Sequence, residues 1–299
     1  MKLSILIPVF NNLNYTKTCL LNLKSQLVDI DSEKEKIYFE IVLIDDGSKD
    51  GTYQWVLDNY KNVHILRGDG KLWWSGSINL GTKYAINELK TDYILWWNND
   101  IIAGDNYFME LMKIIKNNTD YHLIGSKVFR LNENLIWGMG GTFNPKTGIK
   151  YMNGERQSDN QSYKKSLHVD WFPGMGTTIH KNVFIKIGLL DNKRFPQYHG
   201  DSDFTFRAKK AGFNLIAYPG LRIYNDVSNS GLIHKGSVNK LFQSMISIKS
   251  NYNLKKDFLF YRIHTSGILP YKVLIIKYSR YVGGFFKWKI LNVLGIKSK

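Results

Sequence analysis

The chain has 299 residues, of which 43% are hydrophobic and 14% aromatic, and its formal net charge is +16. These values are those of a globular protein with one large core or two closely packed ones. The single cysteine, Cys19, excludes an internal disulfide and fits a reducing compartment. No apolar run reaches about 18 residues, so we expect no ordinary membrane-spanning helix. The run at residues 3–10 is too short for a signal peptide, and we interpret it as a buried strand.

The positive charge is concentrated at the C-terminal end. Residues 255–299 contain ten Lys and Arg residues and one acid, Asp257, and therefore contribute +9 of the net charge. Phe, Tyr and Trp residues are interleaved with these cations, a combination that suits an anionic membrane interface. The alternative is a solvated basic tail that packs through its aromatic side chains. We expect peripheral contact with an anionic membrane and, without a nucleic-acid-binding motif, no nucleic-acid partner.

Strands alternate with helices along the chain. We expect strands at 4–10, 39–44, 63–66 and 93–97, helices at 15–26, 52–60 and 75–89, and a loop at 29–36. Asp50 or Thr52 is expected at the start of the second helix. This alternation predicts an α/β fold with a parallel sheet, right-handed crossovers and ligands at the C-terminal ends of the strands.

The second half has shorter elements among glycines and polar loops. We expect strands at 123–129, 137–143, 171–179 and 215–218 and helices at 183–188 and 202–212. No linker or internal repeat separates this half. We therefore expect it to extend the sheet and to build the second wall of a cleft.

Two acids end the second expected strand. A carboxylate of Asp45 or Asp46 at this position could accept hydrogen bonds from a base N–H or a ribose hydroxyl. An Asp turn with a helix cap is the alternative.

A second polar segment, Asn98-Asn99-Asp100, follows the strand expected at 93–97. Its oxygens could form part of the shell of a hard divalent cation, Mn²⁺ or Mg²⁺, which the diphosphate of a ligand would complete. Asn and Asp are also common in turns. His234 is a further candidate metal ligand or phosphate contact, although a lone histidine is more often structural.

The segment His199-Gly200-Asp201-Ser202-Asp203 places two acids before a helical run. Asp201 could act as a general base towards an acceptor hydroxyl. The alternative is a helix start with first-turn acids, and Asp203 stands at the spacing of a salt bridge with Arg207.

Two glycine-containing segments complete the candidate site. In residues 68–79, Lys71 could reach a phosphate, and Trp74 could stack on a base or a sugar or fill the core. The Gly-Lys-Ser/Thr order of a P-loop is absent. In residues 171–176, which include Trp171 and Gly174, a turn could lie under a sugar diphosphate.

In this order, the motifs resemble the family 2 inverting glycosyltransferases of the GT-A fold, over roughly residues 3–235. The matching pieces lie at residues 4–11, 44–48, 77–81, 97–100 and 199–203, with a further likeness at 184–191. The resemblance implies a Rossmann-like, mixed but mainly parallel sheet flanked by helices, followed by a helical, aromatic and basic extension.

The resemblance also implies roles for individual residues. Pro8 and Asp46 line the nucleobase pocket, Asp100 binds the divalent cation, and Asp201 is the catalytic base. The sequence departs from the family where Asn98 and Asn99 replace acids near the metal and where Gly200 replaces the Glu before the base. The remaining expected contacts are Asn11, Asp45, Lys71, Trp74, Asn79, Asn98, Asn99 and Gly174 for the donor, Trp171, His199 and Asp203 for the acceptor, and His234 for the metal.

We therefore expect a hexosyl- or deoxyhexosyltransferase that moves a sugar from a UDP- or dTDP-sugar to a hydroxyl of a glycan or lipid-linked acceptor. The motifs look most like bacterial surface-polysaccharide enzymes, including rhamnosyltransferases, at the cytoplasmic face of the cell membrane. We expect residues 1–240 to form the GT-A domain, with a nucleotide-binding half at 1–105 and an acceptor-binding half at 106–240, and residues 241–299 to form the extension. A non-catalytic nucleotide-sugar-binding or scaffold protein is the alternative.

Overall fold

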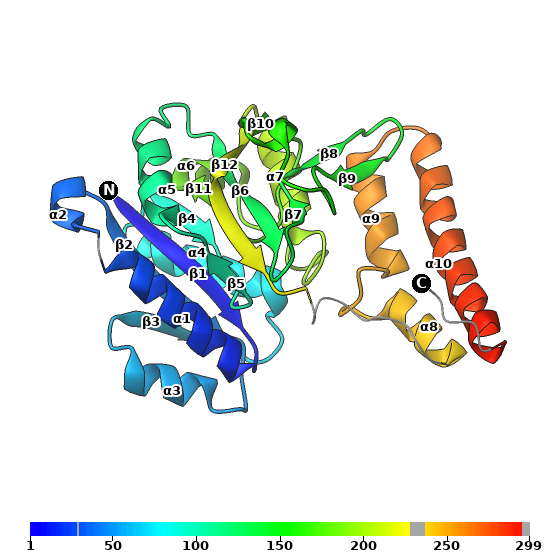
Figure 1. The fold of residues 1–299 in the computed structure, drawn as a ribbon, viewed down its shortest axis with the longest axis horizontal. Coiled ribbons are helices and arrows are strands. Elements are labelled where there is room, and N and C mark those ends of the chain that lie inside the picture. Colours follow the sequence, from blue (N-terminus) through cyan, green and yellow to red (C-terminus); the bar gives the residue numbers. More distant parts are fainter. Residues whose placement is uncertain (29, 228–236, 295–299) are drawn as a thin grey trace.

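The computed structural model describes residues 1–28, 30–227 and 237–294. A ten-stranded sheet lies at the centre of this described part (Figure 1). Its main path has the strand order β10-β12-β6-β11-β4-β1-β2-β3, while β5 pairs with β12 and β7 with β6. The strands are β1 (Lys2–Val9), β2 (Tyr38–Asp45), β3 (Val63–Arg67), β4 (Tyr93–Trp96), β5 (Ile101–Ala103), β6 (Leu123–Arg130), β7 (Ile136–Gly138), β10 (Leu167–His168), β11 (Thr177–His180) and β12 (Leu215–Asn225), and β8 (Gly141–Phe143) and β9 (Lys150–Met152) form a separate hairpin.

The sheet is mixed and mainly parallel, which confirms the predicted fold class. Strands β1, β2, β3, β4, β6 and β12 run in one direction. Strands β11, β10, β5 and β7 run against their neighbours. The parallel strands end at one edge, where an open α/β sheet binds its ligands.

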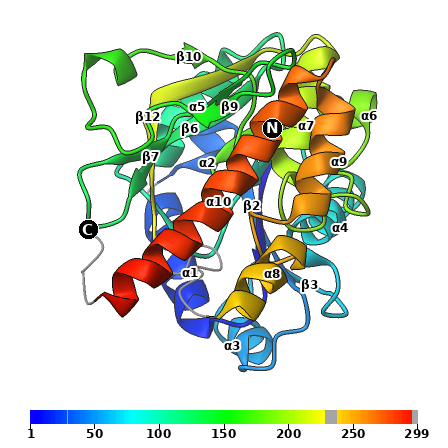
Figure 2. The same ribbon diagram turned by 90° about the vertical axis from the view of Figure 1, so that its right-hand side faces the viewer.

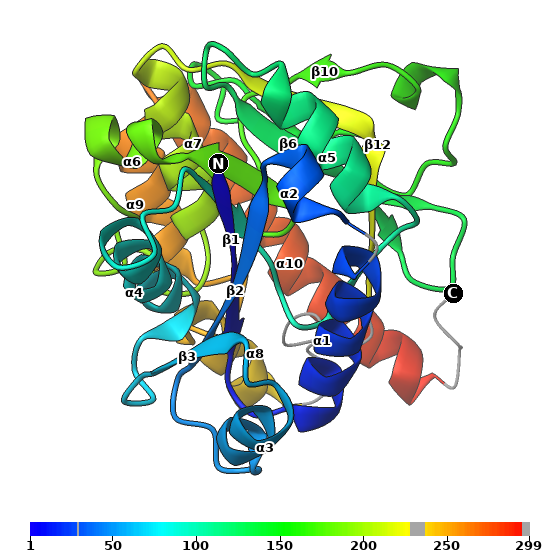
Figure 3. The ribbon, with the colours of Figure 1, turned by 90° about the vertical axis from the view of Figure 1, so that its left-hand side faces the viewer.

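Helices cover both faces of the sheet (Figure 3). Leu3, Ile5 and Ile7 of β1 pack on the side of α1 and α5, whereas Leu6 packs on the side of α4, α6 and α7. Successive side chains of a strand point to opposite faces, so a strand covered on both faces reads as a continuous apolar run. The helices are α1 (Leu13–Leu27), α2 (Ser32–Glu35), α3 (Thr52–Asn59), α4 (Trp73–Asn87), α5 (Tyr107–Lys116), α6 (Lys181–Ile187), α7 (Gly200–Lys210), α8 (Val238–Ile246), α9 (Leu254–His264) and α10 (Leu269–Val293), with a short 3₁₀ helix at Gln161–Tyr163.

The C-terminal helices α8, α9 and α10 lie together at one side of the sheet domain (Figures 1 and 2). An aromatic cluster joins them to it: Phe260 of α9 and Tyr278 of α10 pack with Phe206 of α7 and Phe143 of β8. In the described ranges, we find no helix whose length and apolar character would let it cross a bilayer. The extension is therefore packed onto the domain by its aromatic side chains.

Several element boundaries differ from the predictions. The loop expected at 29–36 contains α2, which Asp31 caps by accepting a hydrogen bond from the amide of Lys34 at 3.0 Å. The strand expected at 137–143 is interrupted at Gly140, whose φ is +63°, and becomes β7 and β8. Helix α5 was not predicted. The strand expected at 171–179 forms only as β11, whereas the one expected at 215–218 continues as β12 through a register shift between Tyr218 and Arg222.

Candidate active site

The expected donor-binding residues follow three adjacent parallel strands. Strands β1, β2 and β4 end at Val9, Asp45 and Trp96, and the polar segments begin within two residues of these ends. Pro8 pairs with Ile44 across β1 and β2. The sheet therefore brings together segments that are about 40 to 90 residues apart in the chain.

Asp46 shapes the loop that follows β3. One carboxylate oxygen accepts a hydrogen bond from the amide of Gly70 and the other from the amide of Trp73, both at 2.9 Å. The side chain is almost completely buried. Lys71 lies between these two donors and is exposed. Asp46 thus holds the backbone that carries Lys71 and starts α4.

Trp74 connects this loop to two other expected site segments. Its indole nitrogen donates to Oδ1 of Asn98 at 3.1 Å, and its ring packs edge-on against Trp96 with centroids 5.5 Å apart. A Cβ at Gly174 would lie 2.2 Å from Cζ2 of Trp74, so only glycine allows this close approach. The ring is therefore fixed between β4 and the turn at Gly174.

Asp201 lies in the first turn of α7, next to the turn at Gly174. Its Oδ2 accepts from the amide of Gly174 at 2.9 Å and its Oδ1 from the amide of Ser202 at 2.7 Å. Two backbone amides thus fix the orientation of the Asp201 side chain. Asp46, Trp74, Gly174 and Asp201 are consequently joined by a continuous series of contacts.

The backbone before Asp201 explains the departure at Gly200. A Cβ there would lie 2.1 Å from Oγ of Ser75 and 3.1 Å from the carbonyl oxygen of Phe195. Helix α7 approaches α4 so closely that a glutamate does not fit unless the Ser75 side chain moves. The missing Glu is thus a matter of packing.

Lys150 of β9 is a site residue that the sequence analysis missed. Its amine donates to Oγ of Ser202 at 2.8 Å and lies 3.9 Å from the centre of the Trp171 ring. Burial lowers the pKa of this amine to about 8, and the charge of Asp201 acts in the opposite direction. Lys150 is therefore a half-buried cation beside the expected base and the expected acceptor-side tryptophan. A single lysine between Ile149 and Tyr151 carries no local signal of this position.

Asp100 has the features of a cation ligand. Its Oδ1 is buried without a hydrogen-bond partner, and burial raises the pKa of its carboxyl to about 6, with the charge of Asp226 adding to the effect. The amide of Asp226 donates to the carbonyl of Asp100 at 3.2 Å, and Oδ1 of the preceding residue, Asn225, is also buried without a partner. Two carboxylates and an amide oxygen fit a hard divalent cation.

Of the two expected metal ligands, Asp100 lies within the described residues. In the ranges that the structure describes, no group of three or more His, Cys, Asp or Glu side chains is arranged to hold a metal ion. His234, the second expected metal ligand, lies outside the described residues.

Several side chains that we expected to contact the donor form hydrogen bonds to other residues of the protein. The amide of Asn79 bonds to both backbone groups of Leu190, at 2.8 and 3.0 Å. Asn11 accepts from the amide of Lys49 at 2.9 Å. Asn99 donates to Thr16 at 3.1 Å. Oδ1 of Asp45 accepts from the amide of Ser48 at 2.7 Å, and Oδ2 of Asp45 is buried without a partner. These side chains therefore hold the walls of the candidate site.

Asp203, expected on the acceptor side, is held in a buried ionic cluster. It accepts from Arg207 and from His264, both at 2.9 Å. Burial opposes ionisation, but these two partners outweigh it and lower the pKa of Asp203. The structure thus contains the salt bridge that the i, i+4 spacing suggested, and Asp203 ties α7 to α9.

Comparison with known proteins gives a consistent family. Residues 4–185 match the model for Glycosyl transferase family 2. The Low-salt glycan biosynthesis hexosyltransferase Agl10 of Haloferax volcanii is 24% identical over 181 residues, which cover 59% of this chain and 55% of that protein. The chain therefore matches only about half the length of this curated relative.

Solved structures share the fold. The structure of S. aureus TarS 1–349 has a TM-score of 0.52 at 15% identity and covers 76% of this chain and 60% of that one. GalNAc-T7, solved with UDP, GalNAc and Mn²⁺, has a TM-score of 0.58 at 14% identity. The matched part covers 94% of this chain and 58% of that one. The sheet and its flanking helices match these GT-A glycosyltransferase structures. Since the family model covers more than half of the sequence, the chain belongs to glycosyl transferase family 2.

Proposed function

We propose that this protein is an inverting glycosyltransferase that uses a UDP- or dTDP-sugar and a hydroxyl of a glycan or lipid-linked acceptor. The observation that carries the proposal is the contact series from Asp46 through Trp74 and Gly174 to Asp201. It joins a nucleotide-side carboxylate to a carboxylate that two backbone amides hold in place. A donor bound along this series would present its sugar towards Asp201.

The proposed reaction assigns one step to Asp201. Its carboxylate removes the proton of the acceptor hydroxyl, and the acceptor oxygen forms a bond to the anomeric carbon of the donor. The bond from that carbon to the diphosphate breaks on the opposite face, so the configuration inverts. Lys150 and Trp171 would border the acceptor side, and Lys71 would reach the diphosphate.

Asp100, with Asp226 and Asn225 beside it, would hold a divalent cation, Mn²⁺ or Mg²⁺. When bound, such a cation would neutralise negative charge on the departing diphosphate. The paired carboxylates and the raised pKa of Asp100 support this assignment, because a nearby cation would relieve the cost of the buried charge.

We also propose that the C-terminal helices contact an anionic membrane at the cytoplasmic face of the cell. Thirteen of the 24 large hydrophobic side chains that are exposed among the described residues lie between residues 242 and 294. The same region carries half of the net positive charge of the sequence. Apolar side chains with interspersed cations support an interfacial position, and this position supports a lipid-linked acceptor of bacterial surface-polysaccharide synthesis.

A donor screen followed by one variant tests the proposed activity. UDP-, dTDP- and GDP-sugars are compared by thermal shift with and without Mn²⁺, since a ligand that binds only the folded state raises the Tm. Asp201→Asn should lower turnover by about 10²- to 10⁴-fold and leave the donor-induced shift intact. Asp58→Asn, on the exposed side of α3, is the matched control. Wild-type turnover in Asp201→Asn would refute the base assignment, and donor binding with neither transfer nor hydrolysis by the wild type would favour a non-catalytic binding protein.

A further inference from the structure

The residue that precedes α7 has an unfavourable backbone conformation. His199 is the N-cap residue of α7, and its φ is +68°. Residues with a Cβ rarely adopt this left-handed backbone conformation, so the surrounding structure must hold His199 in it. Asp201 follows two positions later. Whatever fixes His199 therefore also fixes the direction in which α7 presents Asp201.

Two side chains of α9 hold His199. Its ring stacks on the ring of Phe260, with centroids 4.6 Å apart and an interplanar angle of 20°. Its Nε2 lies 2.8 Å from Oδ1 of Asp257, which is 58 residues away in the chain. The loop that leads to Asp201 is thus held by the C-terminal extension.

Asp257 is in turn held by α10. It is 1% exposed, and its Oδ2 accepts hydrogen bonds from the hydroxyl of Tyr278 at 2.8 Å and from the amine of Lys277. Burial opposes ionisation, but the hydrogen bond from His199 and the charge of Lys277 outweigh it and lower the pKa of Asp257 to about 2. Asp257 is thus an ionised link between α10 and the start of α7.

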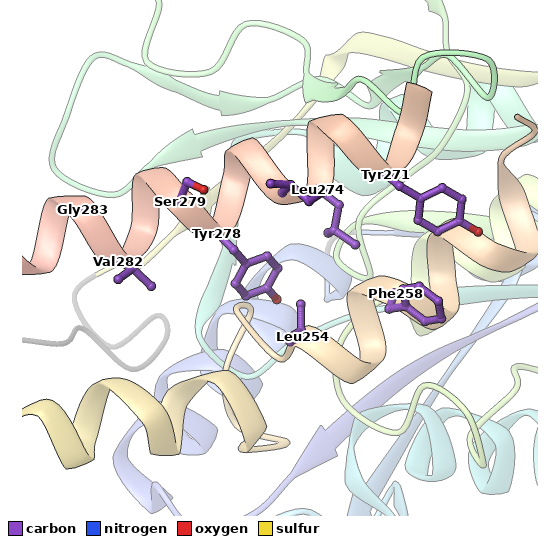
Figure 4. A pocket seen from close by; sticks show the side chains of 9 residues that line it. Leu254, Phe258, Tyr271, Leu274, Tyr278, Ser279, Val282 and Gly283 are labelled. Atoms are coloured by element: carbon purple, nitrogen blue, oxygen red, sulfur yellow. The ribbon is translucent and has the colours of Figure 1, made fainter. Parts of the chain in front are cut away.

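Tyr278, one of the partners of Asp257, also lines an apolar groove of 810 Å³ between α9 and α10. Tyr278 lines this groove together with Leu254 and Phe258 of α9 and Tyr271 of α10 (Figure 4). Tyr278 therefore contributes its ring to the groove and its hydroxyl to Asp257, whereas Tyr271 lines the same groove and is not among the side chains that bond to that carboxylate, which are His199, Lys277 and Tyr278.

We propose that Asp257 is a positioning residue for the transfer reaction: by binding His199, it fixes the orientation of Asp201. The C-terminal helices are then part of the catalytic unit and not only an attachment to a membrane. The inference rests on the proposed role of Asp201. It explains why the acid-poor C-terminal segment contains one buried carboxylate at the place where α9 meets α7.

The test compares kcat with donor binding in the full-length protein. Asp257→Asn should lower kcat by about 10- to 100-fold, because a displacement of about 1 Å at a reacting group costs this much. Donor KM and the donor-induced Tm shift should stay at wild-type values, since Asp46 and Trp74 lie on other elements. Tyr278→Phe should give a smaller decrease in kcat, and Tyr271→Phe, the matched change in the same groove, should give none. Asp257→Glu should recover part of the lost kcat.

A second readout is independent of turnover. Burial lowers the pKa of His199, and the charges of Lys150 and Lys277 lower it too. The hydrogen bond and the charge of Asp257 raise it. The pKa of His199, followed by NMR, should therefore fall further in Asp257→Asn. This shift together with reduced kcat and intact donor binding supports the proposal.

Three outcomes overturn the proposal. Wild-type kcat in Asp257→Asn shows that Asp201 needs no such positioning. A loss of donor binding in proportion to kcat shows that Asp257 only stabilises the fold. A wild type that transfers no sugar, while the pKa of His199 still shifts, refutes the proposed function and with it the positioning role, although the contact itself is then real.

Discussion

The indole nitrogen of Trp74 donates a hydrogen bond to Oδ1 of Asn98 at 3.1 Å, and this contact joins the start of α4 to the end of β4. The same ring packs on Gly174, whose amide binds Asp201. One side chain thus connects three segments of the candidate site. Its removal should affect the site more than the fold.

Trp74→Phe tests this connection. The variant keeps an aromatic ring but leaves Oδ1 of the half-buried Asn98 without its donor, a loss of up to about 3 kcal/mol. We expect donor affinity, measured by titration calorimetry, to fall by about 5- to 100-fold. Trp55→Phe, on α3, is the matched control and should bind the donor as the wild type does. Unchanged affinity in Trp74→Phe would mean that the donor does not depend on this contact.

Gly200→Ala tests the close approach of α7 to α4. The added Cβ would lie 2.1 Å from Oγ of Ser75. We therefore expect the free energy of unfolding to fall by about 1–3 kcal/mol, the usual cost of overpacking a protein interior. Denaturant unfolding measures this change. Adding Ser75→Gly should recover part of the loss. Gly283→Ala, where no atom lies within 4 Å of the new Cβ, should be neutral or stabilising. A fully stable Gly200→Ala would contradict the packing explanation.

Asn79→Ala should act on stability. Both amide atoms of Asn79 bind the backbone of Leu190, and their loss leaves buried backbone groups unpaired at a cost of about 1–3 kcal/mol. The Tm should fall, while the folded protein should bind the donor normally. Asn59→Ala, an exposed asparagine at the end of α3, is the control. A selective loss of donor affinity at unchanged Tm would restore Asn79 as a donor contact.

Lys150→Met should change the pH dependence of stability. The pKa of Lys150 is about 8 in the folded protein and 10.5 ordinarily, so between these values the unfolded chain binds more protons. The free energy of unfolding of the wild type should therefore rise with pH across this window. Denaturant unfolding at several pH values should show a smaller rise for Lys150→Met. Lys272→Met, an exposed lysine of α10, should behave as the wild type does, and equal slopes for all three proteins would contradict the burial of Lys150.

Charge reversal on α10 tests the membrane contact. Lys287→Glu combined with Lys289→Glu removes two cations that would each contribute about 1 kcal/mol near an anionic surface. Sedimentation with phosphatidylglycerol vesicles should show at least about 30-fold weaker binding, and binding by the wild type should weaken with salt. Lys61→Glu combined with Lys83→Glu, on the sheet domain, is the control. Equal loss in both double variants would indicate a general charge effect and no specific face.

Local patterns in the sequence were enough to predict the α/β class and the main strands. Continuous apolar runs such as residues 41–44 identify strands that are buried on both faces, and polar residues directly after them mark the ligand-binding edge. Asp50, predicted near the start of α3, accepts from the amide of Thr52 at 3.2 Å, because capping depends on neighbours in the chain. The strand expected at 215–218, in contrast, continues past Pro219 and Gly220 to Asn225, because β12 pairs with β6 on both sides of a register shift.

The sequence by itself determined the order of the main strands and helices of the first half, the family and the acids that end the strands, because these depend on periodicity and on short motifs. Only the tertiary structure decided which of these polar groups already have partners. Asn79 binds a residue 111 positions away, and His199 binds one 58 positions away. Lys150 acquires its lowered pKa from burial beside Ser202, and Asp257 is ionised because α7 and α10 supply its donors. Burial and long-range pairing depend on how the helices pack, and no spacing along the chain encodes them.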